Sequence, residues 1–225
     1  MQESNVTDKT KTKTIKKSSK IETLQRILIA ARSEFAEKGI AKARIESIAA
    51  TAGVTKQLIY HYYQSKEQLF AYVLDESSGD AMAHLTEKQY VEKPPREALK
   101  DFIVDFPTPF KDPELATLAM EGIHYHDAHS TPRNQFKEKA PVLLKKFSGI
   151  IERGIESGDF RADFNSEQLF AALGLISTGP YTNRYLISVL TGSDPSNEEA
   201  IQKWADFTYR LLLSALEHNR TSELL

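Results

Sequence analysis

The stretch that decides the fold runs Ile45-Glu46-Ser47-Ile48-Ala49-Ala50-Thr51-Ala52-Gly53-Val54-Thr55-Lys56-Gln57-Leu58-Ile59-Tyr60-His61-Tyr62-Tyr63-Gln64-Ser65-Lys66-Glu67-Gln68-Leu69. Its pattern predicts a short helix, a tight turn, a second short helix and the start of a third. Gly53 stands where the chain must reverse, because glycine tolerates the left-handed conformation that such a turn can need. Thr55 is expected to cap the second helix with its hydroxyl. The apolar residues expected to form a small common core are Ile48, Ala52, Val54, Ile59 and Tyr62.

The second helix of this stretch carries several polar side chains that can donate to DNA. They are Lys56, Gln57, Tyr60, His61 and Tyr62. Side chains of these types bind phosphate oxygens or base edges. An ordinary helical hairpin is the alternative, but a helix built only for packing would not need so many donors. The pattern therefore favours a DNA-binding helix-turn-helix, whose second helix lies in the major groove.

A family resemblance rests on the same residues. The segments that carry it are Gly53-Val54-Thr55, Leu58-Ile59-Tyr60, Tyr63, Ser65-Lys66-Glu67 and Leu69, with Ala31, Phe35, Gly39 and Ile48-Ala49 upstream. Over roughly residues 24 to 70, the chain closely resembles the TetR family of bacterial repressors. The rest resembles that family only in its general helical character, as the family's ligand-binding domains usually do.

The resemblance implies roles for individual residues. The expected DNA contacts are Arg44, Thr55, Lys56, Gln57, Tyr60, His61, Tyr62 and Lys66. Lys56 and Gln57 are expected to read bases, while Thr55, Tyr60 and Lys66 are expected to bind phosphate. Arg44 is a special case, because the family usually has Ser or Thr where this chain has Ala43-Arg44. The exchange loses a helix cap worth about 1 kcal/mol and supplies a guanidinium suited to phosphate or guanine.

Charge and composition divide the chain into three parts. Residues 1–66 hold 13 Lys/Arg and 6 Asp/Glu, whereas residues 67–225 hold 16 and 25. A basic head on an acidic body suits a nucleic-acid reader with a separate sensing domain. We expect a disordered basic arm over residues 1–20, a DNA-binding domain over 21–66 and an effector-binding and dimerisation domain over 67–225. The arm either touches DNA or serves as a solubilising tail.

Apolar periodicity predicts helices throughout and no strand. The expected helices lie at 21–38, 45–51, 55–62, 65–85, 96–106, 113–126, 134–157, 166–190 and 197–219. Pro141 is expected to kink or split its helix, and Gly179-Pro180 to bend the one that contains them. The fold class is therefore all-α, with about nine helices. The helix beginning at Ser65 would connect the DNA-binding head to the body.

Several classes of protein are excluded or disfavoured. There is no cysteine, which excludes disulfides and thiolate chemistry. No apolar run is long enough to span a bilayer and no signal peptide is visible, so a cytoplasmic protein is expected. No base and nucleophile stand at a recognisable catalytic spacing, and no cofactor is expected. An all-α enzyme and a helical protein-binding adaptor remain as alternatives.

A histidine-rich segment, His124-Tyr125-His126-Asp127 with His129 nearby, is the second notable cluster. Imidazoles and a carboxylate can bind a metal. Because His124 and His126 lie on different sides of a helix, structural roles are favoured, with a ligand contact as the alternative. No metal site is therefore assigned.

The effector pocket is expected among aromatic and polar residues of the body. The candidates are Phe102, Phe106, Met120, His124, Phe147, Phe170, Thr178, Tyr181, Asn183 and Tyr185. The segment Ile176–Leu190 loosely resembles the equivalent helix of pyrimidine-utilisation regulators. That resemblance implies a small planar effector, aromatic or heterocyclic.

The resemblance also implies a homodimer in which the last two long helices pair with those of a second subunit. The candidates for this interface are Ala171, Ala172, Leu175, Trp204, Leu211, Leu212 and Ala215. A two-fold dimer would place two recognition helices in successive major grooves of a near-palindromic operator. The sequence thus predicts a homodimeric, ligand-responsive transcriptional repressor that its effector releases from DNA.

Overall fold

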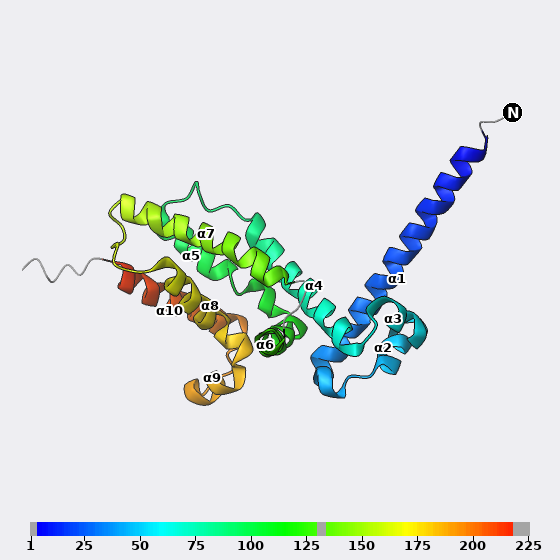
Figure 1. Cartoon of the computed structure of the whole chain (residues 1–225). Coiled ribbons are helices and arrows are strands. Elements are labelled where there is room, and N and C mark those ends of the chain that lie inside the picture. Colours follow the sequence, from blue (N-terminus) through cyan, green and yellow to red (C-terminus); the bar gives the residue numbers. More distant parts are fainter. Residues whose placement is uncertain (1–3, 130–133, 218–225) are drawn as a thin grey trace, which may run out of the picture. The chain divides into compact units, whose positions relative to one another are not determined.

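The protein is all-helical in the computed structural model, which describes the backbone of residues 4–129 and 134–217 and the side chains from Lys20 onward within them. The α-helices are α1 Ser4–Lys42, α2 Ile45–Ala52, α3 Lys56–Tyr63, α4 Lys66–Glu87, α5 Pro95–Asp105, α6 Pro113–Ala128, α7 Gln135–Glu156, α8 Ser166–Thr182, α9 Arg184–Thr191 and α10 Glu198–Leu216 (Figure 1). A 3-10 helix, η1, covers Thr108–Lys111. The described residues contain no strand, and the predicted all-α class is confirmed.

One predicted helix of the body differs from the structure. The single bent helix predicted over 166–190 is wrong, because α8 ends at Thr182 and α9 begins at Arg184. Pro180 lacks an N–H and disturbs the helix locally, and Asn183 then leaves helical geometry at φ −123° and ψ 33°. Pro141, by contrast, does not split α7, which is one helix around it.

The N-terminal segment also differs from its prediction. The sequence predicts a disordered arm over residues 1–20, whereas α1 is helical from Ser4. Residues 1–3 and the side chains of residues 4–19 lie outside the described residues, so DNA contact by the lysines there stays a prediction. At its other end α1 runs past Gly39, where φ of 66° interrupts the helical geometry.

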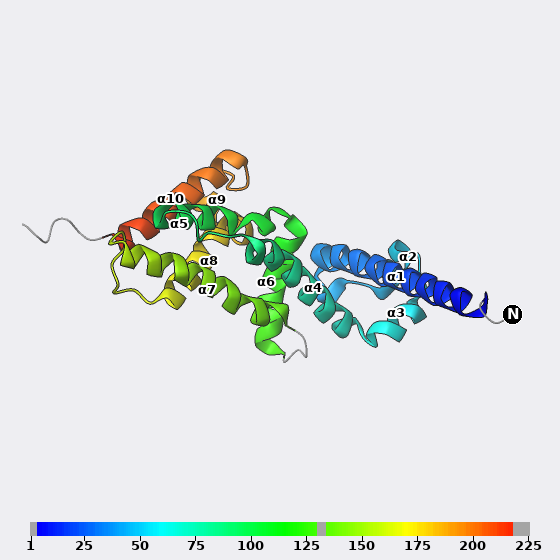
Figure 2. The ribbon, with the colours of Figure 1, turned by 90° about the horizontal axis from the view of Figure 1, so that it is seen from above.

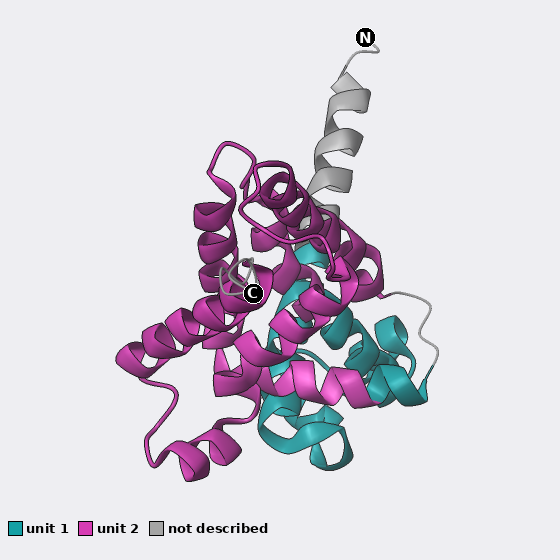
Figure 3. Ribbon diagram, turned by 90° about the vertical axis from the view of Figure 1, so that its left-hand side faces the viewer, with its two compact units in different colours: residues 1–76, 125–133 teal, residues 77–124, 134–225 magenta. Residues whose placement is uncertain are grey.

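The chain forms two compact units (Figure 3). The first, which we call the head, comprises residues 1–76 and 125–133. The second, the body, comprises residues 77–124 and 134–225. The boundaries therefore fall inside α4 and inside α6, and the last turn of α6 belongs to the head.

The core of the head is built from one face of each of its first four helices. Its buried apolar side chains include Ile27, Ala30, Ala31, Phe35, Ile45, Ile48, Ala49, Ala52, Ile59, Tyr63, Leu69, Phe70 and Val73. Phe35 and Phe70 meet edge to face with ring centroids 4.9 Å apart. Tyr63 is buried where the sequence predicts Tyr62, which is only half-buried. Burial raises the pKa of the Tyr63 hydroxyl to about 12, with the nearby Tyr72 as a lesser cause.

The body is a bundle in which α7 packs on α5 and α8, and α10 packs on the same two helices (Figure 2). Its core contains Phe102, Phe147 and Phe160, each almost fully buried. Gly154 makes room for Phe160, since a Cβ at that position would lie 1.9 Å from the ring. No helix in the described part of the chain is both long and apolar enough to cross a membrane.

Replacing Gly53 with alanine should destabilise the protein by about 1–2 kcal/mol, because Gly53 has φ of 63° and an L side chain is strained there. Gly149→Ala is the matched control. That glycine lies within α7, and a Cβ there would meet nothing within 4 Å. The control should be neutral or stabilising by about 0.5–1 kcal/mol. Urea denaturation followed by circular dichroism measures both, and equal stabilities of the two variants would contradict the role of the turn.

Candidate functional site

The turn between α2 and α3 fixes the direction of the second helix. Gly53 ends α2 in the left-handed conformation, and its N–H donates to the Ala50 carbonyl over 3.2 Å. The next N–H, of Val54, reaches back to the Ala49 carbonyl at 3.0 Å. These bonds satisfy carbonyls that the end of a helix leaves open. A Cβ on Gly53 would also lie 3.4 Å from the Arg26 guanidinium, so the turn is closely packed against α1.

Thr55 caps α3 as predicted. Its hydroxyl oxygen accepts the N–H of Leu58 at 3.2 Å, and its backbone is extended. Ile59 and Tyr63 are buried and hold the back of the helix. The opposite face is open, because the exposed residues of the helix are Lys56, Gln57, Tyr60 and His61. The structure thus brings the predicted base-reading residues together on one solvent-facing surface.

Two cations near this surface already have partners on the protein. Lys56 forms an ion pair with Glu46 of α2, and both side chains are about half exposed. Its ammonium also lies 5.8 Å from the Tyr60 ring centroid. Lys20 of α1 stands over the Tyr62 ring at 5.4 Å, an attraction of the cation–π type. The Glu46 carboxylate raises the pKa of the Lys56 ammonium, so this side chain stays charged.

Arg44 and Lys66 lie at the two ends of the helix-turn-helix. Arg44 is exposed and occupies the N-cap position of α2 without a side-chain cap bond, which confirms the missing cap. Lys66 lies in the first turn of α4 and donates to the Ala43 carbonyl at 3.3 Å. Ser65 caps that helix by accepting the Gln68 N–H at 3.1 Å.

A buried carboxylate takes the place of the missing cap. Glu34 of α1 is only 8% exposed. It accepts the backbone N–H of Arg44 at 3.0 Å and the Ser47 hydroxyl at 3.0 Å. The Lys38 ammonium donates to the same carboxylate at 2.8 Å. Burial alone would raise the pKa of Glu34, but these three hydrogen bonds outweigh burial and hold it below its ordinary value.

Sequence reasoning missed Glu34 because it searched for the cap beside the helix and not ten residues upstream. The available signal was an acidic residue directly before Phe35, at a position whose neighbours Ala31 and Phe35 are core residues. A carboxylate next to a core position needs a partner, and the uncapped start of α2 supplies one.

The predicted effector residues fall into two groups. Four phenylalanines pack on one another in the body: Phe102 lies 5.6 Å from Phe147 and 6.2 Å from Phe170, and Phe106 lies 5.7 Å from Phe170. Phe102 and Phe147 have no exposed surface. In this structure the four rings serve as core, and their role as effector contacts stays a prediction.

The other candidates are dispersed over the surface and the helices of the body. Tyr185 is 83% exposed, and His124 and Asn183 are also exposed. Met120 is half-buried in α6. Thr178 donates its hydroxyl to the Gly174 carbonyl at 2.7 Å. Tyr181 lines a cavity beside α8.

The histidine-rich segment belongs to the packing of the head. Tyr125 meets the edge of Phe70 at 5.2 Å, and its hydroxyl lies 3.5 Å from the Glu67 carbonyl oxygen. His129 stacks on Tyr125 with centroids 4.4 Å apart. Burial lowers the pKa of His126, and the Asp75 carboxylate partly opposes this. Within the described ranges, no three His, Cys, Asp or Glu side chains gather where they could hold a metal.

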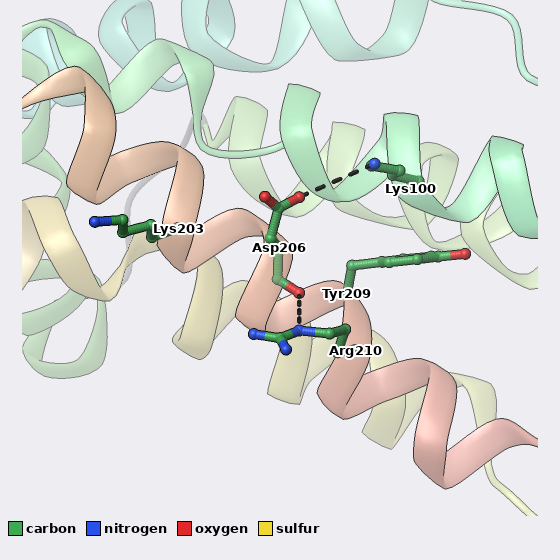
Figure 4. Close-up of a pocket in the computed structure, with 5 residues that line it drawn as sticks. All are labelled: Lys100, Lys203, Asp206, Tyr209 and Arg210. Atoms are coloured by element: carbon green, nitrogen blue, oxygen red, sulfur yellow. Dashed lines mark hydrogen bonds and ion pairs between the residues drawn. The ribbon is translucent and has the colours of Figure 1, made fainter.

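Two hollows in the described part of the body bear on ligand binding. The first, about 440 Å³, is a charged groove on α5 and α10 (Figure 4). Asp206 stands between two of its cations: its carboxylate lies 4.0 Å from Lys100, and its carbonyl accepts from Arg210 at 3.4 Å. The groove therefore already has internal partners for its charges.

The second hollow is a cavity of about 90 Å³ between α5, η1, α8 and α10. Ser177 and Tyr181 of α8 line it, and neither buried hydroxyl has a hydrogen-bond partner among the described residues. A buried hydroxyl left unsatisfied costs about 1–3 kcal/mol, so this cavity is the more distinctive of the two.

Comparisons with known proteins agree with the geometry of the head and the body. The model described as "Bacterial regulatory proteins, tetR family" matches residues 27–73, and the one described as "Tetracyclin repressor-like, C-terminal domain" matches residues 95–212. The chain is 37% identical over 143 residues to the HTH-type transcriptional repressor SCO4008 of Streptomyces coelicolor, covering 61% of this chain and 71% of that protein. It is 27% identical over 198 residues to the HTH-type transcriptional repressor NicS of Pseudomonas putida, covering 86% of this chain and 92% of that one.

A solved structure shares the fold. It is that of PfmR, a TetR family transcriptional regulator from Thermus thermophilus, with a TM-score of 0.59 and 24% identity over 86% of this chain and 97% of that one. The chain therefore belongs to the TetR family. It is a DNA-binding transcriptional regulator with a helix-turn-helix, and the two relatives above are named as repressors.

Glu34→Gln should lower stability by about 1–3 kcal/mol at neutral pH, because it weakens three hydrogen bonds to a buried charge. Since the pKa of Glu34 is lowered in the folded state, its contribution is present above its ordinary pKa of 4.5 and is lost as the pH falls through the lower, folded value. Urea denaturation between neutral pH and pH about 3 should show this loss in the native chain and a flatter profile in the variant. Glu37→Gln, on the exposed side of the same helix, is the control, and an identical effect there would contradict the role of Glu34.

Proposed function

We propose that the protein is a homodimeric, ligand-responsive repressor that binds a near-palindromic operator and leaves it when a small effector binds the body. The observation that carries the proposal is the recognition helix α3. Its back is fixed by buried Ile59 and Tyr63, and its front presents exposed donors. Family membership supports the regulatory role.

The residues that read bases lie in the first turn of α3. Gln57 is exposed there and can form a bidentate pair with adenine. Lys56 would read guanine after exchanging Glu46 for DNA, and this exchange costs little because exposed ion pairs are weak. Glu46 keeps the ammonium near the surface of the helix in the free protein, and it disfavours other anions at the same place.

The residues around that helix would bind DNA phosphates. Thr55, Tyr60, His61 and Tyr62 offer hydroxyls and an imidazole along its length, and Lys66 lies at the start of α4. The amide N–H groups at the start of α4 add a partial positive charge. Arg44 is free of a capping role because Glu34 serves the start of α2, so its guanidinium is available for DNA.

A second copy of the chain would pair through α8 and α10. Three large apolar side chains on these helices are exposed: Leu175 at 78%, Phe207 at 45% and Leu211 at 43%. Exposed apolar surface of this kind marks an interface. Leu175 and Leu211 belong to the predicted interface residues, whereas Phe207 does not. Of the other predicted residues, Ala171 is exposed, Leu212 is buried in the core of the body, and Trp204 donates its indole N–H to the Ile176 carbonyl at 2.8 Å. We assign the interface to the exposed set.

The effector would act through helices shared by the two units. α4 carries Lys66 at one end and continues into the body, and the last turn of α6 packs in the head through Tyr125. A ligand that prefers one arrangement of these helices would lower DNA affinity by its differential affinity, typically about 1–3 kcal/mol. Since its target is chromosomal DNA, the protein would work in the cytoplasm.

The direct test is selection of binding sites from a random duplex pool with the full chain. The proposal expects an enriched sequence with two inverted half-sites and a steep salt dependence of affinity. An adaptor or an enzyme without DNA binding would enrich no sequence, and that result would contradict the proposal.

Arg44→Ala should weaken binding to the selected duplex by about tenfold per site, because it removes a charged hydrogen bond to the DNA backbone. The slope of log affinity against log salt should fall by about 0.9 for each phosphate that Arg44 no longer neutralises. Fluorescence anisotropy at several salt concentrations measures both quantities. Lys203→Ala removes another exposed cation, from α10 of the body, and should change neither. Unchanged affinity and slope for Arg44→Ala would remove Arg44 from the interface.

The double variant Leu175→Glu, Leu211→Glu should be monomeric, because both carboxylates would have to be buried in the proposed interface. Light scattering coupled to gel filtration reports the mass directly. The control is Ile123→Glu, which introduces the same charge at a 64% exposed side chain of α6. If the double variant keeps the mass of a dimer, the chains pair elsewhere.

A further inference from the structure

Two buried hydroxyl groups line the cavity between α5, η1, α8 and α10. Ser177 is 4% exposed, and its hydroxyl has no hydrogen-bond partner among the described residues. Tyr181 follows one helical turn later on the same face of α8, and its buried hydroxyl also lacks a partner. Both residues line one cavity. Buried polar groups are normally satisfied, so two unsatisfied hydroxyls beside one hollow indicate a missing hydrogen-bonding partner.

The charged residues around the cavity indicate the charge of the missing partner. The lining includes the cation Lys111 and no acidic residue. Lys111 is exposed at the rim of the cavity and has no carboxylate partner among the described residues. Burial raises the pKa of the Tyr181 hydroxyl, so the phenol stays protonated and is a donor at neutral pH. Two hydroxyl donors and one ammonium favour an anion that accepts hydrogen bonds.

The apolar lining and the small volume of the cavity restrict which anions can fit. Apolar side chains such as Ile103, Pro180 and Ile201 form much of the lining, and they suit a short hydrocarbon body. A volume of about 90 Å³ is well below that of a typical drug-sized site, about 300–1,000 Å³. Two of the polar lining residues are already engaged, since the Thr108 hydroxyl donates to the Val104 carbonyl of α5 and the Thr208 hydroxyl donates to the Trp204 carbonyl within α10.

We propose that this cavity binds a small monocarboxylate with a short apolar body, whose carboxylate accepts hydrogen bonds from Ser177 and Tyr181 and faces Lys111. The proposal rests on the proposed function in one respect, because it makes the cavity the effector site of the repressor. It places the effector against α8 and α10, which also carry the proposed dimer interface. The aromatic cluster of Phe102, Phe106, Phe147 and Phe170 then remains core.

The probe is butyrate, with its neutral amide butyramide as the matched ligand. Isothermal titration calorimetry on the full chain should give a dissociation constant on the order of 1 mM or tighter for butyrate. Butyramide should bind at least about tenfold more weakly, because it lacks the charge that Lys111 and the two hydroxyls recognise. Equal binding of both ligands, or no binding of butyrate, would overturn the proposal.

Three variants locate the binding in this cavity. The affinity for butyrate should fall by about tenfold in each of Ser177→Ala, Tyr181→Phe and Lys111→Met. Tyr209→Phe, which removes a tyrosine hydroxyl from the charged groove instead, is the control and should leave binding unchanged. Equal losses in Tyr181→Phe and Tyr209→Phe would overturn the assignment.

The free protein supplies a second readout. Ser177→Ala and Tyr181→Phe remove polar groups that have no protein partner, so neither should lower the unfolding temperature of the ligand-free chain. A fall of several degrees in both would show that bound water already satisfies the hydroxyls, and it would overturn the proposal of a ligand site.

Anisotropy with the selected duplex separates this proposal from the proposed function. If butyrate releases the DNA from the native chain but not from Tyr181→Phe, the result supports both the ligand site and the repressor function. Butyrate binding that depends on the three residues but leaves DNA bound supports the site and contradicts its effector role. Release of DNA by a different metabolite, with unchanged response in all three variants, supports the repressor and overturns this site.

Discussion

The direction of α3 depends on a short turn that three local features fix together. Gly53 reverses the chain with a positive φ, Thr55 caps the next helix, and the N–H groups of Gly53 and Val54 close onto α2. Because α3 is only eight residues long, it would be marginal as an isolated helix. Its position comes from this turn and from Ile59 and Tyr63 buried beneath it. Base reading requires a rigid helix with an exposed polar face, because the helix must enter the groove with its side chains already in position.

Glu34 shows how a local departure from the family pattern is compensated at a distance. The sequence predicts a missing cap at Ala43-Arg44, and the structure confirms it. The sequence could not predict that a carboxylate ten residues upstream accepts the N–H group at the start of α2, because that pairing depends on how α1 packs against α2. The consequence is functional, since the backbone of Arg44 binds Glu34 while its exposed side chain makes no cap bond.

The sequence predicts the helices and their order well because apolar periodicity, prolines and caps are local signals. Thr55 and Gly53 each act where they were expected to act. Its errors concern tertiary context. Asn183 ends α8 where a bent helix was expected, and Tyr63 replaces Tyr62 in the core. In the body, aromatic residues suggest a pocket by type alone, yet the four phenylalanines fill space with one another. The unsatisfied hydroxyls of Ser177 and Tyr181 become visible only when their neighbours are known.

The central claim is that two copies of this chain read two half-sites through α3. The most direct measurement compares the selected duplex with one in which about five base pairs, half a helical turn, are inserted between the half-sites. Native mass spectrometry gives the number of chains bound, and anisotropy gives the affinity. The account predicts two chains on the selected duplex and a large loss of affinity on the lengthened one, because the second α3 would then face the wrong side of the DNA. One chain per duplex, or equal affinity for both duplexes, would contradict it.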